Sequence, residues 1–100
     1  MESPRKELKR LEDSYYLTVQ GGVTYILDKN ARDKVVESMS DKDCRIIAVQ
    51  GNILNVRSII GIFTYDKYIN SKMVSGDIER MIKELKSDIE YENTSNLIRR

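Results

Sequence analysis

The 100-residue chain has no histidine and a single cysteine, Cys44. Without imidazole there is no base for Ser-His or Cys-His nucleophiles. One thiol supplies neither a disulfide nor a set of zinc ligands, and the glycines form no phosphate-cradling loop. Carboxylates such as Asp41 and Asp43 leave acid–base chemistry open, although capping commonly places acidic residues at the ends of elements. We therefore predict a protein that is not an enzyme and uses no metal or cofactor.

Neither sign of charge dominates, since 17 Lys and Arg balance 16 Asp and Glu to a formal net charge of +1. This balance argues against a protein that only coats nucleic acid, because phosphate binding depends on accumulated cations. The charged N-terminus lacks the apolar run of a signal peptide, and no stretch reaches the ~18 apolar residues of a membrane span. We expect a cytoplasmic protein, in the cytosol of a host cell, without membrane contact.

The most apolar stretch, Cys44–Phe63, is predicted to contain a β-hairpin. Gly51 and Asn52 suit the centre of a type II′ turn, which favours glycine first. Pairing outward from this turn gives one apolar face and one mixed face. The apolar face sets Val49 opposite Leu54 and Ile47 opposite Val56. The mixed face carries Ile46, Ala48, Gln50, Ile53, Asn55 and Arg57.

A second hairpin is predicted over Tyr15–Leu27, with Gly21 and Gly22 in a two-residue turn. Because side chains alternate along a strand, the turn also assigns the faces. One face holds Leu17, Val19, Thr24 and Ile26. The other holds Tyr16, Thr18, Val23, Tyr25 and Leu27.

Two helices are predicted around the first hairpin. Ser3 and Pro4 form a cap and first-turn pair for a helix up to about Glu12, which either docks or frays. A second helix spans residues 28–40, with Asn30 as its cap. Its apolar stripe is Ala31, Val35, Val36 and Met39.

The clearest helix begins near Asp77 and is expected to end at residues 93–96. Its apolar stripe is Ile78, Met81, Ile82, Leu85 and Ile89. Residues 58–63 either continue a bent strand, with a bulge at Gly61, or leave the sheet. Residues 65–73 are expected to form a short helix or an ordered loop.

Together these segments predict an α+β fold of the order hairpin–helix–hairpin–helix, preceded by a further helix. We expect a small antiparallel sheet built from both hairpins, with helices packed on one face. The length predicts a single domain over residues 1–100. Within it, residues 1–13 form an N-terminal helix or arm, residues 14–92 the core, and residues 93–100 a mobile tail.

The candidate binding surface is the sheet face formed by the tyrosine face of the first hairpin and the mixed face of the second. Tyr16, Tyr25 and Arg57 are expected on it. Tyrosines on a sheet can stack unpaired bases, and basic side chains can add phosphate contacts. The basic residues are Arg5, Lys6, Lys9 and Arg10 on the first helix, with Arg99 and Arg100 at the other end. The same face has the apolar content of a docking site for another protein or of a homodimer contact. Alternatively, the first helix or residues 65–73 cover it.

The string from Ile46 to Ile62 contains an Asn-Val-x-x-Ile-x-Gly-Ile pattern. It resembles a segment of small phage and prophage proteins of low-GC Gram-positive bacteria, and the resemblance extends from Tyr16 to Phe63 without carrying over any functional residue. The resemblance implies an anti-defence or inhibitor protein that binds a host enzyme or defence complex. It leaves two alternatives: a single-stranded RNA or DNA accessory protein, and a dimer that sequesters a small molecule.

Overall fold

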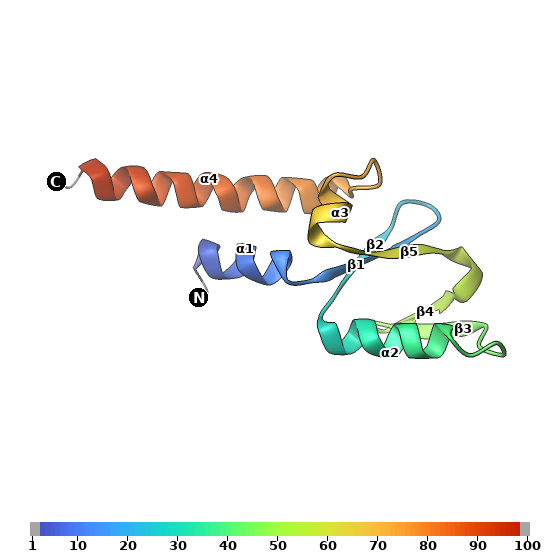
Figure 1. The fold of residues 1–100 in the computed structure, drawn as a ribbon. Coiled ribbons are helices and arrows are strands. Elements are labelled where there is room, and N and C mark those ends of the chain that lie inside the picture. Colours follow the sequence, from blue (N-terminus) through green and yellow to red (C-terminus); the bar gives the residue numbers. More distant parts are fainter. Residues whose placement is uncertain (1–2, 99–100) are drawn as a thin grey trace.

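The computed structural model describes residues 3–98, and the side chains of residues 3–92. Helices and antiparallel strands confirm the α+β class (Figure 1). In chain order the elements are α1 (Pro4–Glu12), β1 (Tyr15–Val19), β2 (Thr24–Leu27), α2 (Lys29–Met39), β3 (Ile46–Val49), β4 (Asn52–Asn55), the 3₁₀ turn η1 (Val56–Ser58), β5 (Ile59–Thr64), α3 (Tyr65–Ile69) and α4 (Gly76–Ile98).

The two hairpins do not merge into the single sheet that we expected. β1 is the central strand of a three-stranded sheet, β2-β1-β5, while β3 and β4 form a separate two-stranded sheet. The expectation was wrong because β5, rather than the second hairpin, takes the other edge of β1. η1 leads the chain from β4 into β5. The pairing of β5 with β1 shifts its register between Thr18 and Val19, beside Gly61. Residues 58–63 therefore belong mainly to the sheet of the first hairpin.

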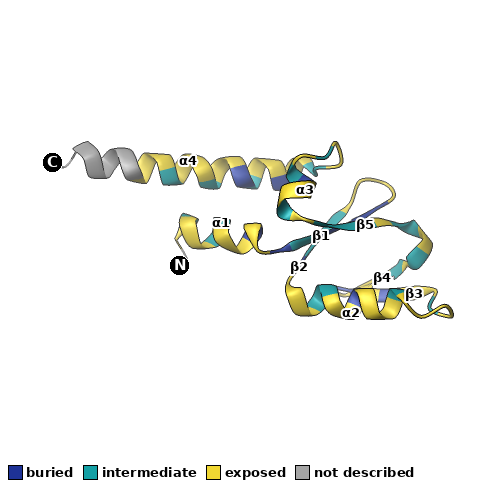
Figure 2. Cartoon of the chain, in the orientation of Figure 1, coloured by how far each residue is buried: buried dark blue, intermediate teal, exposed yellow. Residues whose placement is uncertain are grey.

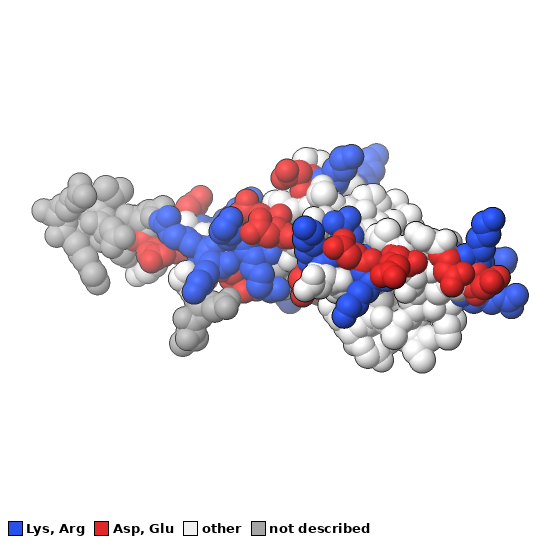
Figure 3. All heavy atoms as spheres, turned by 60° about the horizontal axis from the view of Figure 1, so that its bottom comes forward, with Lys and Arg blue, Asp and Glu red and all other residues white. Residues whose placement is uncertain are grey.

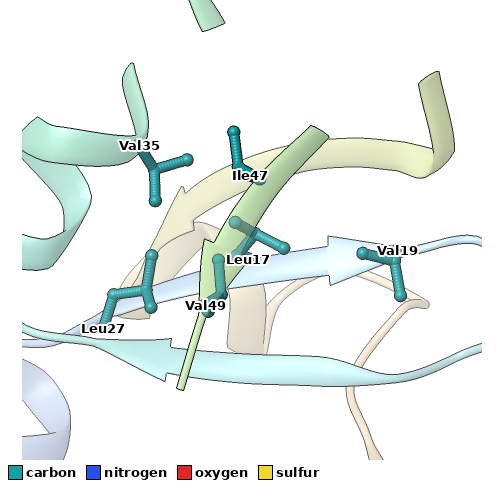
Figure 4. Packing of buried hydrophobic residues seen from close by; sticks show 6 residues of the cluster. All are labelled: Leu17, Val19, Leu27, Val35, Ile47 and Val49. Atoms are coloured by element: carbon teal, nitrogen blue, oxygen red, sulfur yellow. The ribbon is translucent and has the colours of Figure 1, made fainter. Parts of the chain in front are cut away.

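Both faces of β1 are buried, so the predicted packing of helices on one face is also wrong. On one face Tyr16 packs against a cluster from α1, α3 and α4, which includes Leu11, Tyr68, Ile78 and Ile82. On the other face Leu17 and Val19 meet side chains of β2, α2 and β3 (Figure 4): Leu27, Val35, Ile47 and Val49. The three-stranded sheet is thus a middle layer, with α2 and the β3–β4 hairpin on the side opposite α3 and α4 (Figure 1).

The register of the first hairpin differs by one residue from the prediction. The Val19 N–H donates to the Val23 oxygen at 3.0 Å, so the loop holds three residues, Gln20–Gly22, rather than two. Tyr25 consequently pairs with Leu17 instead of sharing a face with Tyr16. A one-residue slip exchanges the faces of a whole strand, and this is why the two tyrosines lie on opposite sides of the sheet.

The register of the second hairpin differs by two residues. Gln50 and Gly51 have φ values of 49° and 80°, as a type I′ turn requires, so the turn lies one residue earlier than expected. Ile47 therefore pairs with Leu54, and Val49 pairs with Asn52. A shift of two residues preserves the alternation of side chains, and the predicted faces of β3 and β4 are retained.

The caps of the first two helices give one confirmed and one corrected prediction. The Ser3 hydroxyl accepts from the Lys6 N–H at 3.3 Å, and α1 docks against α4 rather than fraying. α2 is capped by Asp28, not Asn30, since Asp28 Oδ1 accepts from the Ala31 N–H at 2.7 Å. The cap lies earlier because the helix begins directly after β2.

The last two helices follow the predicted spacing, except at the C-terminus. Residues 65–69 form the short helix α3. The buried residues of α4, Ile78 and Ile82, lie in the half of the helix nearest the sheet (Figure 2). α4 runs to Ile98, so the predicted end of this helix at residues 93–96 is wrong. Asn, Thr and Ser lower helix propensity by under about 0.7 kcal/mol each, which does not by itself stop a helix. Residues 99–100 of the predicted tail lie outside the described residues.

Replacing Tyr16 by Ala should test the double-sided packing of β1. The side chain is fully buried, and its loss is expected to lower the free energy of unfolding by about 3–5 kcal/mol. Tyr91→Ala on α4 is the matched control, because Tyr91 is 76% exposed and should change stability by less than about 0.5 kcal/mol. Urea denaturation followed by circular dichroism measures both variants. Equal losses in the two would contradict this packing.

Candidate protein-binding surface

Tyr16, predicted on an open sheet face, is fully buried. Its ring stacks on Tyr68 with a centroid distance of 4.5 Å and an interplanar angle of 4°. Its hydroxyl donates to the Leu11 oxygen at 2.6 Å. The prediction of Tyr16 as a contact residue is therefore wrong, because α1, α3 and α4 cover the face on which it lies.

Tyr25 and Arg57 are not brought together with Tyr16. Tyr25 is half-buried and packs against the cluster around Leu17. Arg57 is exposed on η1, where it lines a separate hollow of about 640 Å³ together with Arg45. The three residues predicted to share a surface thus occupy three different environments.

The basic side chains of α1 lie largely beside carboxylates. The pairs are Arg5 with Glu92 at 4.0 Å, Lys9 with Asp13 at 3.5 Å, and Arg10 with Glu7. Such exposed pairs add little stability, but they offset the positive charge that a phosphate contact would need. Lys6 is exposed on the same helix, while Arg99 and Arg100 lie outside the described residues.

The second hairpin carries an exposed apolar surface. Ile46 and Ile53 are 61% and 73% exposed, and the register places both on one face with Ala48 and Asn55. We call these four residues the outer hairpin face. The opposite face, with Ile47 and Val49, anchors the hairpin against β1 (Figure 4). The mixed face predicted for this hairpin is therefore the one that faces solvent.

A groove of about 320 Å³ lies between β3 and α2. The consecutive residues 46–50 line one wall; because alternate side chains point to opposite faces, this wall is the edge of the strand rather than either face. The other wall is one side of α2, formed by Ala31, Lys34, Val35 and Ser38. The space-filling view shows a broad uncharged area beside the charged side chains of the molecule (Figure 3).

The comparisons with protein-family models, curated proteins and solved structures find no match to this chain. Within the described residues, no three His, Cys, Asp or Glu side chains gather to hold a metal ion. In the same part of the chain, no helix is long and apolar enough to cross a membrane. The outer hairpin face and the adjoining groove are the candidate binding surface.

The groove residues of α2 were missed at the level of sequence. Ala31 and Val35 were predicted only as part of an apolar helix stripe, and Lys34 and Ser38 were given no role. Their common role arises because α2 packs beside β3, and no local pattern encodes that arrangement. The one available signal was the absence of charge in β3, Ile-Ile-Ala-Val.

Burial raises the pKa of Tyr16 above the usual range for tyrosine, and the neighbouring Tyr65 and Tyr68 raise this pKa further. The unfolded chain loses the same proton near pH 10. The stabilisation that comes from the protonated hydroxyl is therefore complete below about pH 10 and is lost as the pH rises toward the folded-state pKa. Tyr65, whose pKa is also raised by burial, contributes in the same direction.

Tyr16→Phe should isolate the alkaline effect of Tyr16. At about pH 8 the variant is expected to be less stable by about 1 kcal/mol, because the bond to the Leu11 oxygen is lost. At about pH 10.5 the difference should shrink, because only the wild type loses the contribution of this hydroxyl. Urea denaturation of both proteins at the two pH values provides the measurement. A difference that stays constant with pH would refute this role of Tyr16.

Proposed function

We propose that this chain is a protein-binding module that acts by occupying a surface of another protein. The outer hairpin face carries the proposal, because Ile46 and Ile53 remain largely in water although the chain has a buried core for other isoleucines. Contiguous exposed apolar surface of this kind is typical of protein interfaces. Since the hairpin already holds both side chains in place, covering them removes apolar area from water at little further cost in order.

The edges of the second hairpin support the same function. Natural edge strands usually carry lysine, proline or a bulge, which prevent pairing with other chains. β3 has the sequence Ile-Ile-Ala-Val and β4 has Asn-Ile-Leu-Asn, so neither strand contains a charge or a proline. An unprotected edge next to an exposed apolar face favours association with another protein.

In this proposal the partner is a bacterial host enzyme or defence complex, as the resemblance to small phage proteins implies. A binder of this type inhibits by covering a functional surface and needs no catalytic group of its own. Binding of single-stranded nucleic acid has weaker support, because Tyr16 is buried and the basic residues of α1 lie beside carboxylates.

A pull-down from a Gram-positive bacterial lysate, with and without nuclease, should test the outer hairpin face. We expect the tagged protein to retain one host protein in the presence of nuclease, and the double variant Ile46→Lys, Ile53→Lys to lose it. Lysine at both positions places two charges where the partner would otherwise remove water. Val23→Lys is the matched control, because Val23 is 50% exposed and directly follows the loop of the other hairpin.

Two results would overturn the proposed function. One is recovery of host material that disappears on nuclease treatment, which would favour the nucleic-acid alternative. The other is equal retention of the host protein by the double variant and by Val23→Lys, which would place the contact elsewhere on the molecule. Circular dichroism of each variant separates loss of binding from loss of folding.

A further inference from the structure

The hydrogen-bond pattern of the second hairpin shows which backbone groups of β3 face the groove. The Val56 N–H donates to the Arg45 oxygen at 2.9 Å, and the two-residue turn pairs Val49 with Asn52. Bonded and non-bonded pairs alternate along an antiparallel ladder. The N–H and C=O groups of Ala48 therefore point away from β4, as does the N–H of Ile46.

These groups lie along the wall of the groove, and the described residues offer them no backbone hydrogen-bond partner. Among the described residues, no hydrogen bond outside the strand ladders uses the N–H or C=O of Ala48. The Ile46 oxygen accepts only a weak contact, from Cys44 Sγ at 3.2 Å. Along the strand, the free groups are therefore the donor of Ile46 followed by the donor and the acceptor of Ala48, and the complement of such a row is another extended backbone.

The side chains that line the groove indicate which side chains the incoming extended segment would carry. Leu27, Val35, Ile47 and Val49 are buried core residues that also line the groove, so it offers apolar surface to an incoming side chain. Lys34 is the charged residue among those lining it, and no ion pair with a described carboxylate engages its ammonium group. An occupant with apolar side chains and one carboxylate matches this environment.

We propose that this groove binds an extended peptide segment of the partner protein, which adds as a strand to β3 and pairs a carboxylate with Lys34. The inference rests on the proposed function and adds to it the binding mode and the chemistry of the partner. Each strand residue advances about 3.3 Å, so four or five residues of the segment would match the four residues of β3.

A second copy of this chain fits the groove less well than a single extended segment. In each copy the β3 edge is flanked by its own α2, which lines the same groove. Pairing two such edges would bring the two α2 helices and their sheets together at a space of about 320 Å³. A lone segment brings only its own backbone and side chains, so the geometry favours a flexible or terminal region of another protein.

The probe for this inference is a display library of random linear eight-residue peptides, selected against the full chain. We expect enrichment of peptides that alternate apolar residues and carry one Asp, one Glu or a free C-terminus. Synthetic peptides from this pool then allow affinity to be measured by fluorescence anisotropy. Methylating the backbone nitrogen at alternate positions should abolish binding in one register and spare it in the other, because strand addition uses every second amide.

Variants of the protein test the two walls of the groove separately. Lys34→Glu should weaken an acidic peptide by about tenfold or more, and a peptide with Lys in place of its acidic residue should recover affinity for this variant. Lys29→Glu is the matched control, because Lys29 lies on α2 but does not line the groove. Ala48→Pro removes an N–H that the hairpin itself does not use, and should weaken binding by about tenfold.

The outcomes separate failure of the inference from failure of the proposed function. If the host protein is lost with Ile46→Lys, Ile53→Lys but kept by Lys34→Glu and Ala48→Pro, the apolar face is used and strand addition is refuted. Selection of no peptide, or an affinity that Lys34→Glu and both methylation registers leave unchanged, also refutes it. Self-association that Ala48→Pro abolishes would assign the edge to a second copy instead. If Ala48→Pro does not fold, the Lys34 charge exchange and the methylated peptides still decide.

Discussion

The burial of β1 on both faces is the constraint on which the rest of this structure depends. Tyr16 and Tyr68 form its centre on one face: their rings stack, and the Tyr68 hydroxyl donates to Thr24 Oγ1 at 3.1 Å and accepts from the Ser75 N–H at 2.6 Å. These contacts join α1, the sheet, α3 and the start of α4. Buried hydroxyls need such partners, because an unsatisfied polar group in a core costs about 1–3 kcal/mol. The hydrogen bonds of both hydroxyls and the stacking of both rings therefore fix where the three helices lie.

The occupation of β1 by two neighbours also explains the exposed surface of the second hairpin. Since β2 and β5 take both edges of β1, the β3–β4 hairpin packs on a face of that sheet through Ile47 and Val49. A two-stranded sheet packed in this way keeps one face and its outer edges free. The apolar residues of that face and the groove beside α2 are therefore consequences of the fold, and the proposed function uses surfaces that the packing leaves open.

The features that were predicted correctly depend on local signals in the sequence. Ser3 caps α1, the stripe through Ile78 and Ile82 places α4 against the core, and both hairpins form where glycines allow positive φ. Each of these depends on residues within a few positions of one another. The contact residues were harder, because Tyr16 and Tyr25 differ in exposure through a one-residue register that the three-residue loop sets. Glycine pairs permit both loop lengths, so the sequence pattern was compatible with either.

The sequence by itself determined the α+β class, the two hairpins, the helices α1 and α2, the start of α4, and the amphipathic faces of β3 and β4. Periodicity and turn chemistry act over a few residues, and they are readable for that reason. Only the tertiary structure decided that β5 rather than β3–β4 completes the sheet, that Tyr16 is buried, and that α2 and β3 form a groove. Those outcomes depend on which surfaces, distant in the sequence, pack together and exclude water. Local sequence patterns do not show which distant segments these are.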